Sequence, residues 1–202
     1  MNNLHKALDD IGSIRRQMAR STEFRGYGPA TLASTAVFAL LAALTQALWL
    51  PDPSRHIAAY LGIWIATAVL SAALIAVQTY TRTHRVHSGM ADEMIHMAIE
   101  QFLPAVAAGT LLTIAVARFV PTVAWMLPGL WQIIFGLGVF ASCRFLPKAM
   151  PVVGVWYLAS GLAALAFAQG PLAFSPWTMG IGFGVGQPLV ALVLRYAEPA
   201  DD

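Results

Sequence analysis

The stretch Pro29–Leu50, PATLASTAVFALLAALTQALWL, contains 22 residues and no charged side chain. An α-helix rises 1.5 Å per residue, so a helix of this length reaches about 33 Å and can cross the roughly 30 Å hydrocarbon core of a bilayer. Gly28 precedes the stretch and Pro51 follows it, and both residue types favour helix ends. We therefore expect a membrane-spanning helix here.

Five further apolar segments of similar length follow: Ile57–Thr79, Phe102–Val120, Val123–Cys143, Ala149–Ala168 and Pro176–Leu194. Hydrophobic residues make up 58% of the chain and charged residues only 11%, whereas soluble domains carry about 25% charged residues. Because backbone groups in hydrocarbon must pair within their own segment, these segments should be helices. The sequence predicts an all-α, polytopic bundle of six transmembrane helices over residues 29–196.

Lysine and arginine residues are unevenly divided between the two sides of the predicted bundle. Ten of the twelve precede the first span, follow the sixth, or lie between spans two and three or four and five, which leaves Arg55 and Arg118 on the other side. Positive charge accumulates on the cytoplasmic side of membrane proteins. The bias predicts a multi-pass protein of the bacterial inner membrane with both termini in the cytoplasm, ending in a short acidic tail at residues 197–202.

Residues 1–28 form a charged leader before the first span. Within residues 2–21, apolar side chains recur at alternating spacings of three and four, which predicts an amphipathic cytoplasmic helix. The side chains on its apolar seam are Leu4, Ala7, Ile11, Ile14 and Met18. Three interpretations stay open: docking of a cytoplasmic protein or a second copy, contact with anionic lipid, or packing against the protein's own loops.

The connection at residues 82–100, called the elbow here, combines histidines with carboxylates. Glu93, His96 and Glu100 share one helix face, and Glu-x-x-His is a spacing used by carboxylate-bridged dimetal bundles. Such sites need two copies of this motif, and this chain has one. The alternatives are a polar stripe facing water, a divalent metal site and a pH-responsive histidine contact. We therefore predict no cofactor, with a divalent metal at these three residues as an alternative.

The sixth span contains two overlapping glycine motifs followed by a proline. They are Gly180-x-x-x-Gly184 and Gly182-x-x-x-Gly186, with Gln187 and Pro188 directly after them. Small residues allow helices to approach closely, which favours a packing face within the bundle or between copies. A broken helix that lines a ligand path is the alternative. The glutamines within the spans are expected to hydrogen bond neighbouring helices.

The chain contains no nucleophile-elbow, zinc-protease, phosphate-loop or dinucleotide motif, so the sequence favours a non-enzymatic protein. A net charge of +2 provides no basic surface for direct nucleic-acid binding.

Residues Ile14–Leu44, IRRQMARSTEFRGYGPATLASTAVFALLAAL, resemble a group of uncharacterised bacterial inner-membrane proteins. Members of this group are about this size and are often encoded beside small winged-helix regulators. The resemblance includes no catalytic motif, and it implies a docking or sensing role for the leader.

Our first expectation is therefore an inner-membrane protein that docks a cytoplasmic partner, as a regulator, sensor or accessory subunit, through the leader helix and the elbow. The first alternative is a small oligomeric permease or channel that uses the glycine-rich sixth span. The second alternative is a metal-binding membrane protein.

Overall fold

The computed structural model describes residues 29–83 and 89–197, and within these residues the protein is all-α. Six α-helices are present in the described part of the chain: α2 (Pro29–Trp49), α3 (Ile57–Thr83), α4 (Gly89–Phe119), α5 (Leu127–Ser142), α6 (Pro151–Phe167) and α7 (Pro176–Ala197). Three short 3₁₀ helices join them: η1 (Pro121–Met126), η2 (Cys143–Phe145) and η3 (Gly170–Leu172). The predicted all-α class is confirmed.

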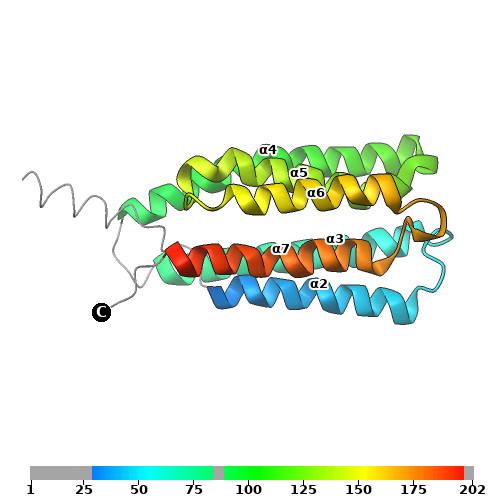
Figure 1. Cartoon of the computed structure of the whole chain (residues 1–202), viewed down its shortest axis with the longest axis horizontal. Coiled ribbons are helices and arrows are strands. Elements are labelled where there is room, and N and C mark those ends of the chain that lie inside the picture. Colours follow the sequence, from blue (N-terminus) through cyan, green and yellow to red (C-terminus); the bar gives the residue numbers. More distant parts are fainter. Residues whose placement is uncertain (1–28, 84–88, 198–202) are drawn as a thin grey trace, which may run out of the picture.

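The helices run along one long axis and form two layers (Figure 1). One layer contains α4, α5 and α6, and the other contains α2, α3 and α7. The most extensive helix pairs are α5 with α6 and α2 with α7, while α4 packs on α5 and α3 packs on α2. Contacts of α7 with α5 and α6 join the two layers, and Ile57 and Leu61 of α3 also pack against residues of α4 and η1.

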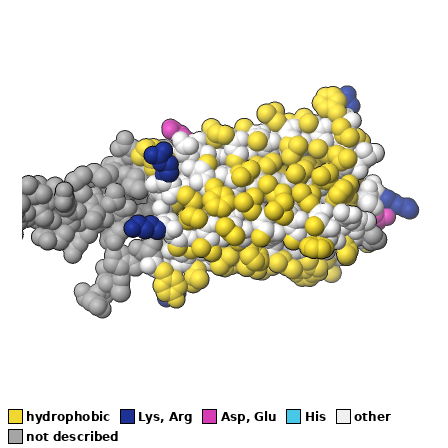
Figure 2. All heavy atoms as spheres, turned by 45° about the horizontal axis from the view of Figure 1, so that its top comes forward, with side chains coloured by type: hydrophobic (Ala, Val, Ile, Leu, Met, Phe, Trp, Pro, Cys, Tyr) yellow, Lys and Arg dark blue, Asp and Glu magenta, His cyan; other side chains and the backbone are white. Residues whose placement is uncertain are grey.

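The face of the bundle in Figure 2 is largely apolar between its two ends, and each of the six helices exposes large apolar side chains. Four stretches in the described residues are long and apolar enough to cross a membrane: Ile57–Gln78, Met97–Phe119, Pro121–Phe145 and Pro176–Tyr196. Two shorter apolar helices accompany them, at Ala33–Trp49 and Pro151–Phe167. Soluble monomers rarely expose apolar patches of this extent. These features support a membrane protein.

Helix α4 begins before the predicted third span and contains a proline, Pro104, within its continuous course from Gly89 to Phe119. A proline removes the hydrogen bond to the carbonyl four residues earlier, which here belongs to Glu100. Both residues are exposed.

The fourth predicted span also begins differently, as the 3₁₀ helix η1 followed by α5. Pro128 has no N–H to donate to the carbonyl of Ala124, so the α-helical hydrogen bond between these two residues is missing at this junction. Both residues are buried, which places this irregular backbone inside the protein, where it is tolerated at membrane depth.

Candidate functional site

Helix α7 uses its two glycine motifs on two different faces. Gly180 and Gly184 face α2. A Cβ added at Gly180 would lie 2.8 Å from the Cβ of Ala43, and one added at Gly184 would lie 2.9 Å from a methyl group of Leu40. Side chains at these two positions would therefore push α2 away.

Gly182 and Gly186 face the opposite layer. A Cβ at Gly182 would collide with the side-chain oxygen of Gln132 on α5, and a Cβ at Gly186 would collide with the ring and hydroxyl of Tyr157 on α6. The overlapping motifs thus allow α7 to lie close to both layers at once. The four glycines are in contact with the protein's own helices.

Two buried polar side chains, Gln132 and Tyr157, pack against α7. Gln132 and Tyr157 are both fully buried. The Gln132 amide N–H donates to the carbonyl oxygens of Pro128 and Thr178, both at 3.2 Å. The Gln132 carbonyl oxygen and the Tyr157 hydroxyl have no hydrogen-bond partner in the described residues. Unpaired polar atoms are costly in apolar surroundings, and the Tyr60 hydroxyl is a third such atom in the described residues.

Gln187 and Pro188 point in different directions, although they are neighbours in sequence. Gln187 is buried and lies near the Tyr157 hydroxyl, outside ideal hydrogen-bonding geometry. Pro188 is exposed on the outer face of α7. The helix continues unbroken through Pro188 to Ala197, so the interruption that the permease alternative assumed is not present. Only Gln187 of this pair joins the central polar cluster.

A second set of polar contacts joins helices near the end of the bundle where α2 finishes and α7 begins. The Gln46 amide N–H donates to the carbonyl of Phe174 at 2.6 Å, and the Trp64 indole N–H donates to the Gln46 carbonyl oxygen at 2.8 Å. This pair of bonds ties together α2, α3 and the segment before α7. The expectation that span glutamines bond to neighbouring helices is confirmed for Gln46 and for Gln132.

Three tryptophans within the spans donate indole N–H hydrogen bonds, which our sequence analysis did not predict. Besides Trp64, the indole N–H of Trp131 donates to the Thr113 hydroxyl at 2.8 Å, and that of Trp156 donates to the Gly182 carbonyl at 2.9 Å. A tryptophan within an apolar span must find an acceptor for its N–H, which is a signal available in the sequence.

The turn between α2 and α3 is ordered around Asp52. The Ser54 hydroxyl donates to the Asp52 carboxylate at 2.5 Å, and the Arg55 side chain lies 3.0 Å from the other carboxylate oxygen. The hydrogen bond from Ser54, together with Arg55, holds the pKa of the Asp52 carboxyl below its usual value. Because Arg55 is paired within its own turn, we assign no further role to it.

The predicted docking and metal residues fall mainly outside the described part of the chain. This is the case for the leader residues Leu4, Ala7, Ile11, Ile14 and Met18, and for the side chains of Glu93 and His96. Glu100 is exposed on α4. Among the described residues, no group of three or more histidine, cysteine or acidic side chains is placed to hold a metal ion. The metal site remains a prediction.

Comparison of the chain with protein-family models, curated proteins and solved structures finds no significant match. The resemblance of Ile14–Leu44 to bacterial inner-membrane proteins therefore stays a prediction.

Proposed function

We propose that this protein crosses the bacterial inner membrane six times and docks a cytoplasmic partner through the leader helix and the elbow. In this proposal the protein is non-enzymatic and serves as a regulatory, sensor or accessory subunit. Three features of the described residues support it: the packing of the two shorter helices, the distribution of charge, and the length of α4.

The packing of α6 on α5 supports six crossings. Gly161 lies against the backbone of Gly129, where an added Cβ would be 2.6 Å from the carbonyl oxygen, and Gly136 lies against the backbone of Gly154, where the matching distance is 3.1 Å. The two contacts are seven residues apart on each helix, so α6 follows α5 in an antiparallel register along two turns. Since α5 belongs to a stretch long enough to cross a membrane, a helix packed along it at the same depth should cross as well.

The shorter helix α2 is related to α7 in the same way. Ala43 packs at Gly180 and Leu40 packs one turn further along at Gly184. Because α7 is one of the four long apolar helices, α2 should share its depth. Six crossings place both termini on the same side.

The charged side chains indicate which end is cytoplasmic. Figure 2 shows lysine and arginine side chains at the two ends of the bundle and apolar side chains between them. Arg144, Lys148 and Arg195 are exposed at the end where α7 finishes, and Arg55 and Arg118 are exposed at the opposite end. Together with the cations in the leader and the elbow, this distribution favours a cytoplasmic location for the first end.

The projection of α4 is the observation that carries the docking proposal. Its first eight residues, Gly89–His96, precede the apolar stretch Met97–Phe119. At 1.5 Å per residue they extend about 12 Å beyond the apolar region. In Figure 1, α4 reaches farther than the other helices at the end where α2 begins, which is also where the leader joins. A helix that extends out of the bilayer at the end of the bundle where α2 begins is suited to bind a soluble protein.

Co-purification from native membranes tests this proposal. Deleting residues 2–21 should leave an inserted, folded protein that no longer retains its cytoplasmic partner, as judged by mass spectrometry of the bound proteins. The double variant Ile11→Asp, Ile14→Asp should have the same effect because it disrupts the apolar seam. The variant Arg16→Gln, on another face of the leader, is the matched control. Unchanged partner retention after the deletion would reject the docking role.

The permease or channel is retained as a second candidate because of the central polar cluster. Gln132, Tyr157 and Gln187 gather at membrane depth around α7, and polar side chains inside a membrane frequently mark a solute path. A small displacement of α7 would expose the unpaired Gln132 carbonyl oxygen and Tyr157 hydroxyl.

The swelling of proteoliposomes in urea or glycerol gradients, followed by light scattering, tests this candidate. Flux that exceeds that of empty liposomes and falls with Gln132→Leu would support it, and flux equal to that of empty liposomes would dispose of it for these solutes.

A further inference from the structure

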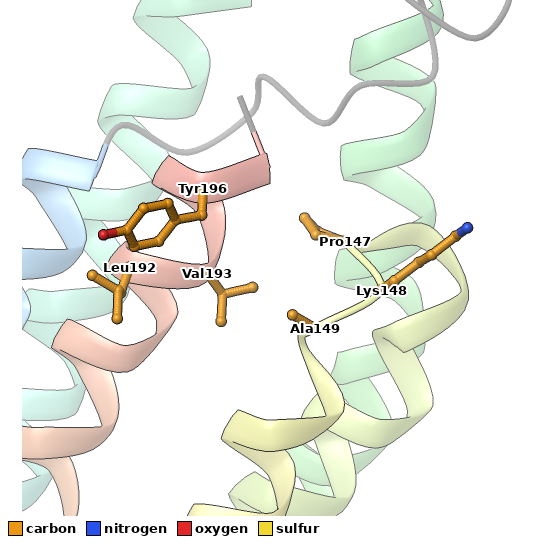
Figure 3. Close-up of a pocket in the computed structure, with 6 residues that line it drawn as sticks. All are labelled: Pro147, Lys148, Ala149, Leu192, Val193 and Tyr196. Carbon is orange, nitrogen blue, oxygen red and sulfur yellow. The ribbon is translucent and has the colours of Figure 1, made fainter. Parts of the chain in front are cut away.

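A shallow groove opens at the cation-rich end of the bundle, between the α5–α6 connection and the last turns of α7 (Figure 3). We call it the Lys148 groove. It has a volume of about 330 Å³ and is lined by Pro147, Lys148, Ala149, Leu192, Val193 and Tyr196. The proposed function uses Lys148 only as one of the cations at this end of the bundle, and it uses no other residue of the groove.

The lining of the groove changes from apolar to polar toward the end of the bundle. Leu192 lies one turn before Tyr196 on α7, which is about 6 Å deeper along the helix axis. Figure 3 shows Val193 and Ala149 on facing sides of the groove, while the Lys148 side chain extends outward from its loop. The apolar lining therefore suits a hydrocarbon chain, and Lys148 at the rim supplies an exposed ammonium, whereas the Tyr196 ring points away from Lys148 and lies over Leu192 (Figure 3).

The charge around the rim favours an anion. Lys148, Arg144 and Arg195 are all exposed at this end. The helix α6 begins at Pro151, two residues after Ala149, so the positive end of its dipole lies on the same side of the groove as Lys148. Arg195 lies in the last turn of α7, where it offsets the negative end of that dipole.

We propose that the Lys148 groove binds one anionic phospholipid, with an acyl chain along Leu192 and Val193 and the headgroup phosphate at Lys148. Basic sites between transmembrane helices on the cytoplasmic side are a known form of lipid recognition. A peptide is a poorer occupant, because the lining side chains supply one ammonium and one hydroxyl for its many backbone groups. The inference rests on the proposed membrane orientation and is independent of partner docking.

Native mass spectrometry of the full-length, delipidated protein in detergent tests this site. The probes are phosphatidylglycerol and phosphatidylcholine with identical acyl chains. We expect phosphatidylglycerol to bind about fivefold more tightly, the ratio that a single lysine near an anionic headgroup supplies. Lys148→Gln should abolish this preference, and Ala149→Trp, which fills the groove, should weaken the binding of both lipids. Arg118→Gln, an exposed cation at the opposite end, is the matched control and should change neither affinity.

Several outcomes would overturn the proposal. Equal affinities for the two lipids in the unmodified protein, or a preference that survives Lys148→Gln, would show that the groove does not select an anion. Phosphatidylglycerol binding that requires removal of residues 198–202 would identify the acidic tail as the occupant. Loss of self-association with Ala149→Trp, without loss of lipid, would identify a second copy. Lys148 and Ala149 are both exposed, so neither variant should disturb folding, and circular dichroism checks this.

Failure of this site and failure of the docking role are distinguishable. Deleting residues 2–21 should leave the phosphatidylglycerol preference intact, whereas Lys148→Gln should leave the cytoplasmic partner bound. A preference that disappears with the leader would mean that the leader, and not the groove, holds the lipid.

Discussion

Gln46 joins three parts of the chain through two hydrogen bonds, with the Trp64 indole as donor and the Phe174 carbonyl as acceptor. Replacing Gln46 with leucine removes both bonds and leaves the buried indole N–H unpaired. We expect Gln46→Leu to lower the free energy of unfolding by about 1–3 kcal/mol. Denaturation in mixed detergent micelles, followed by tryptophan fluorescence, measures this change.

A double-mutant cycle separates this bond from general packing. Trp64→Phe keeps most of the ring and removes the donor. Combined with Gln46→Leu, it should reveal a coupling energy of about 0.6–1.7 kcal/mol, the range found for hydrogen bonds between membrane helices. Additive effects of the two changes would mean that the bond contributes nothing to stability.

The contact between Gly161 and Gly129 leaves no room for a side chain on either helix. A Cβ at Gly161 would lie 2.6 Å from the Gly129 carbonyl oxygen and 3.0 Å from the backbone nitrogen of Ile133, so the backbone of α5 would have to move. We expect Gly161→Ala to lower the free energy of unfolding by about 1–3 kcal/mol. Gly62→Ala is the control, because no atom lies within 4 Å of the added Cβ, and alanine is the better helix former. Equal stabilities of the two variants would refute the close α5–α6 packing.

The polar residues of the spans were visible in the sequence, but their partners were not. Gln46 stands out because it interrupts a run of apolar residues, yet its acceptor, the Phe174 carbonyl, lies 128 residues further along the chain. Such a pairing depends on which helices become neighbours, and apolar spans carry little information about that choice. Gly129 and Gly136 are seven residues apart, and so are Gly154 and Gly161. This matching spacing was a sequence signal for the α5–α6 packing, and our sequence analysis considered only the glycine motifs of α7.

At the scale of single elements, helix α7 shows how packing overrides a local helix breaker. Pro188 denies the Gly184 carbonyl its usual N–H partner, but Pro188 is exposed and α7 continues to Ala197. We expect Pro188→Ala to leave the stability unchanged or to raise it by up to about 3 kcal/mol, since it restores that hydrogen bond. Pro104→Ala in α4 is a matched control with the same exposure. Destabilisation by Pro188→Ala alone, measured by thermal denaturation in detergent, would show that α7 depends on a proline bend.

Helix boundaries were the best predicted feature, and the reason is physical. Five of the six predicted spans begin within about two residues of a helix or its 3₁₀ extension, because charged and turn-forming residues mark the ends of apolar runs. The helix that contains the third span begins earlier, at Gly89, since α4 continues past the apolar stretch Met97–Phe119 into the elbow. Hydropathy detects the lipid-facing part of a helix and not a polar extension of it.

At the scale of the whole molecule, six crossings differ from four in whether the two shorter helices, α2 and α6, also cross the membrane. In a Cys143→Ala background, single cysteines can be placed in three connections by Ser54→Cys, Lys148→Cys and Gln169→Cys, all at exposed positions. Six crossings place Ser54 and Gln169 on the periplasmic side and Lys148 on the cytoplasmic side. A membrane-impermeant maleimide should therefore label Ser54→Cys and Gln169→Cys in intact cells, and Lys148→Cys only after permeabilisation. Lys148 and Gln169 flank α6, so labelling of both from the same side would mean that α6 does not cross, despite its packing along α5.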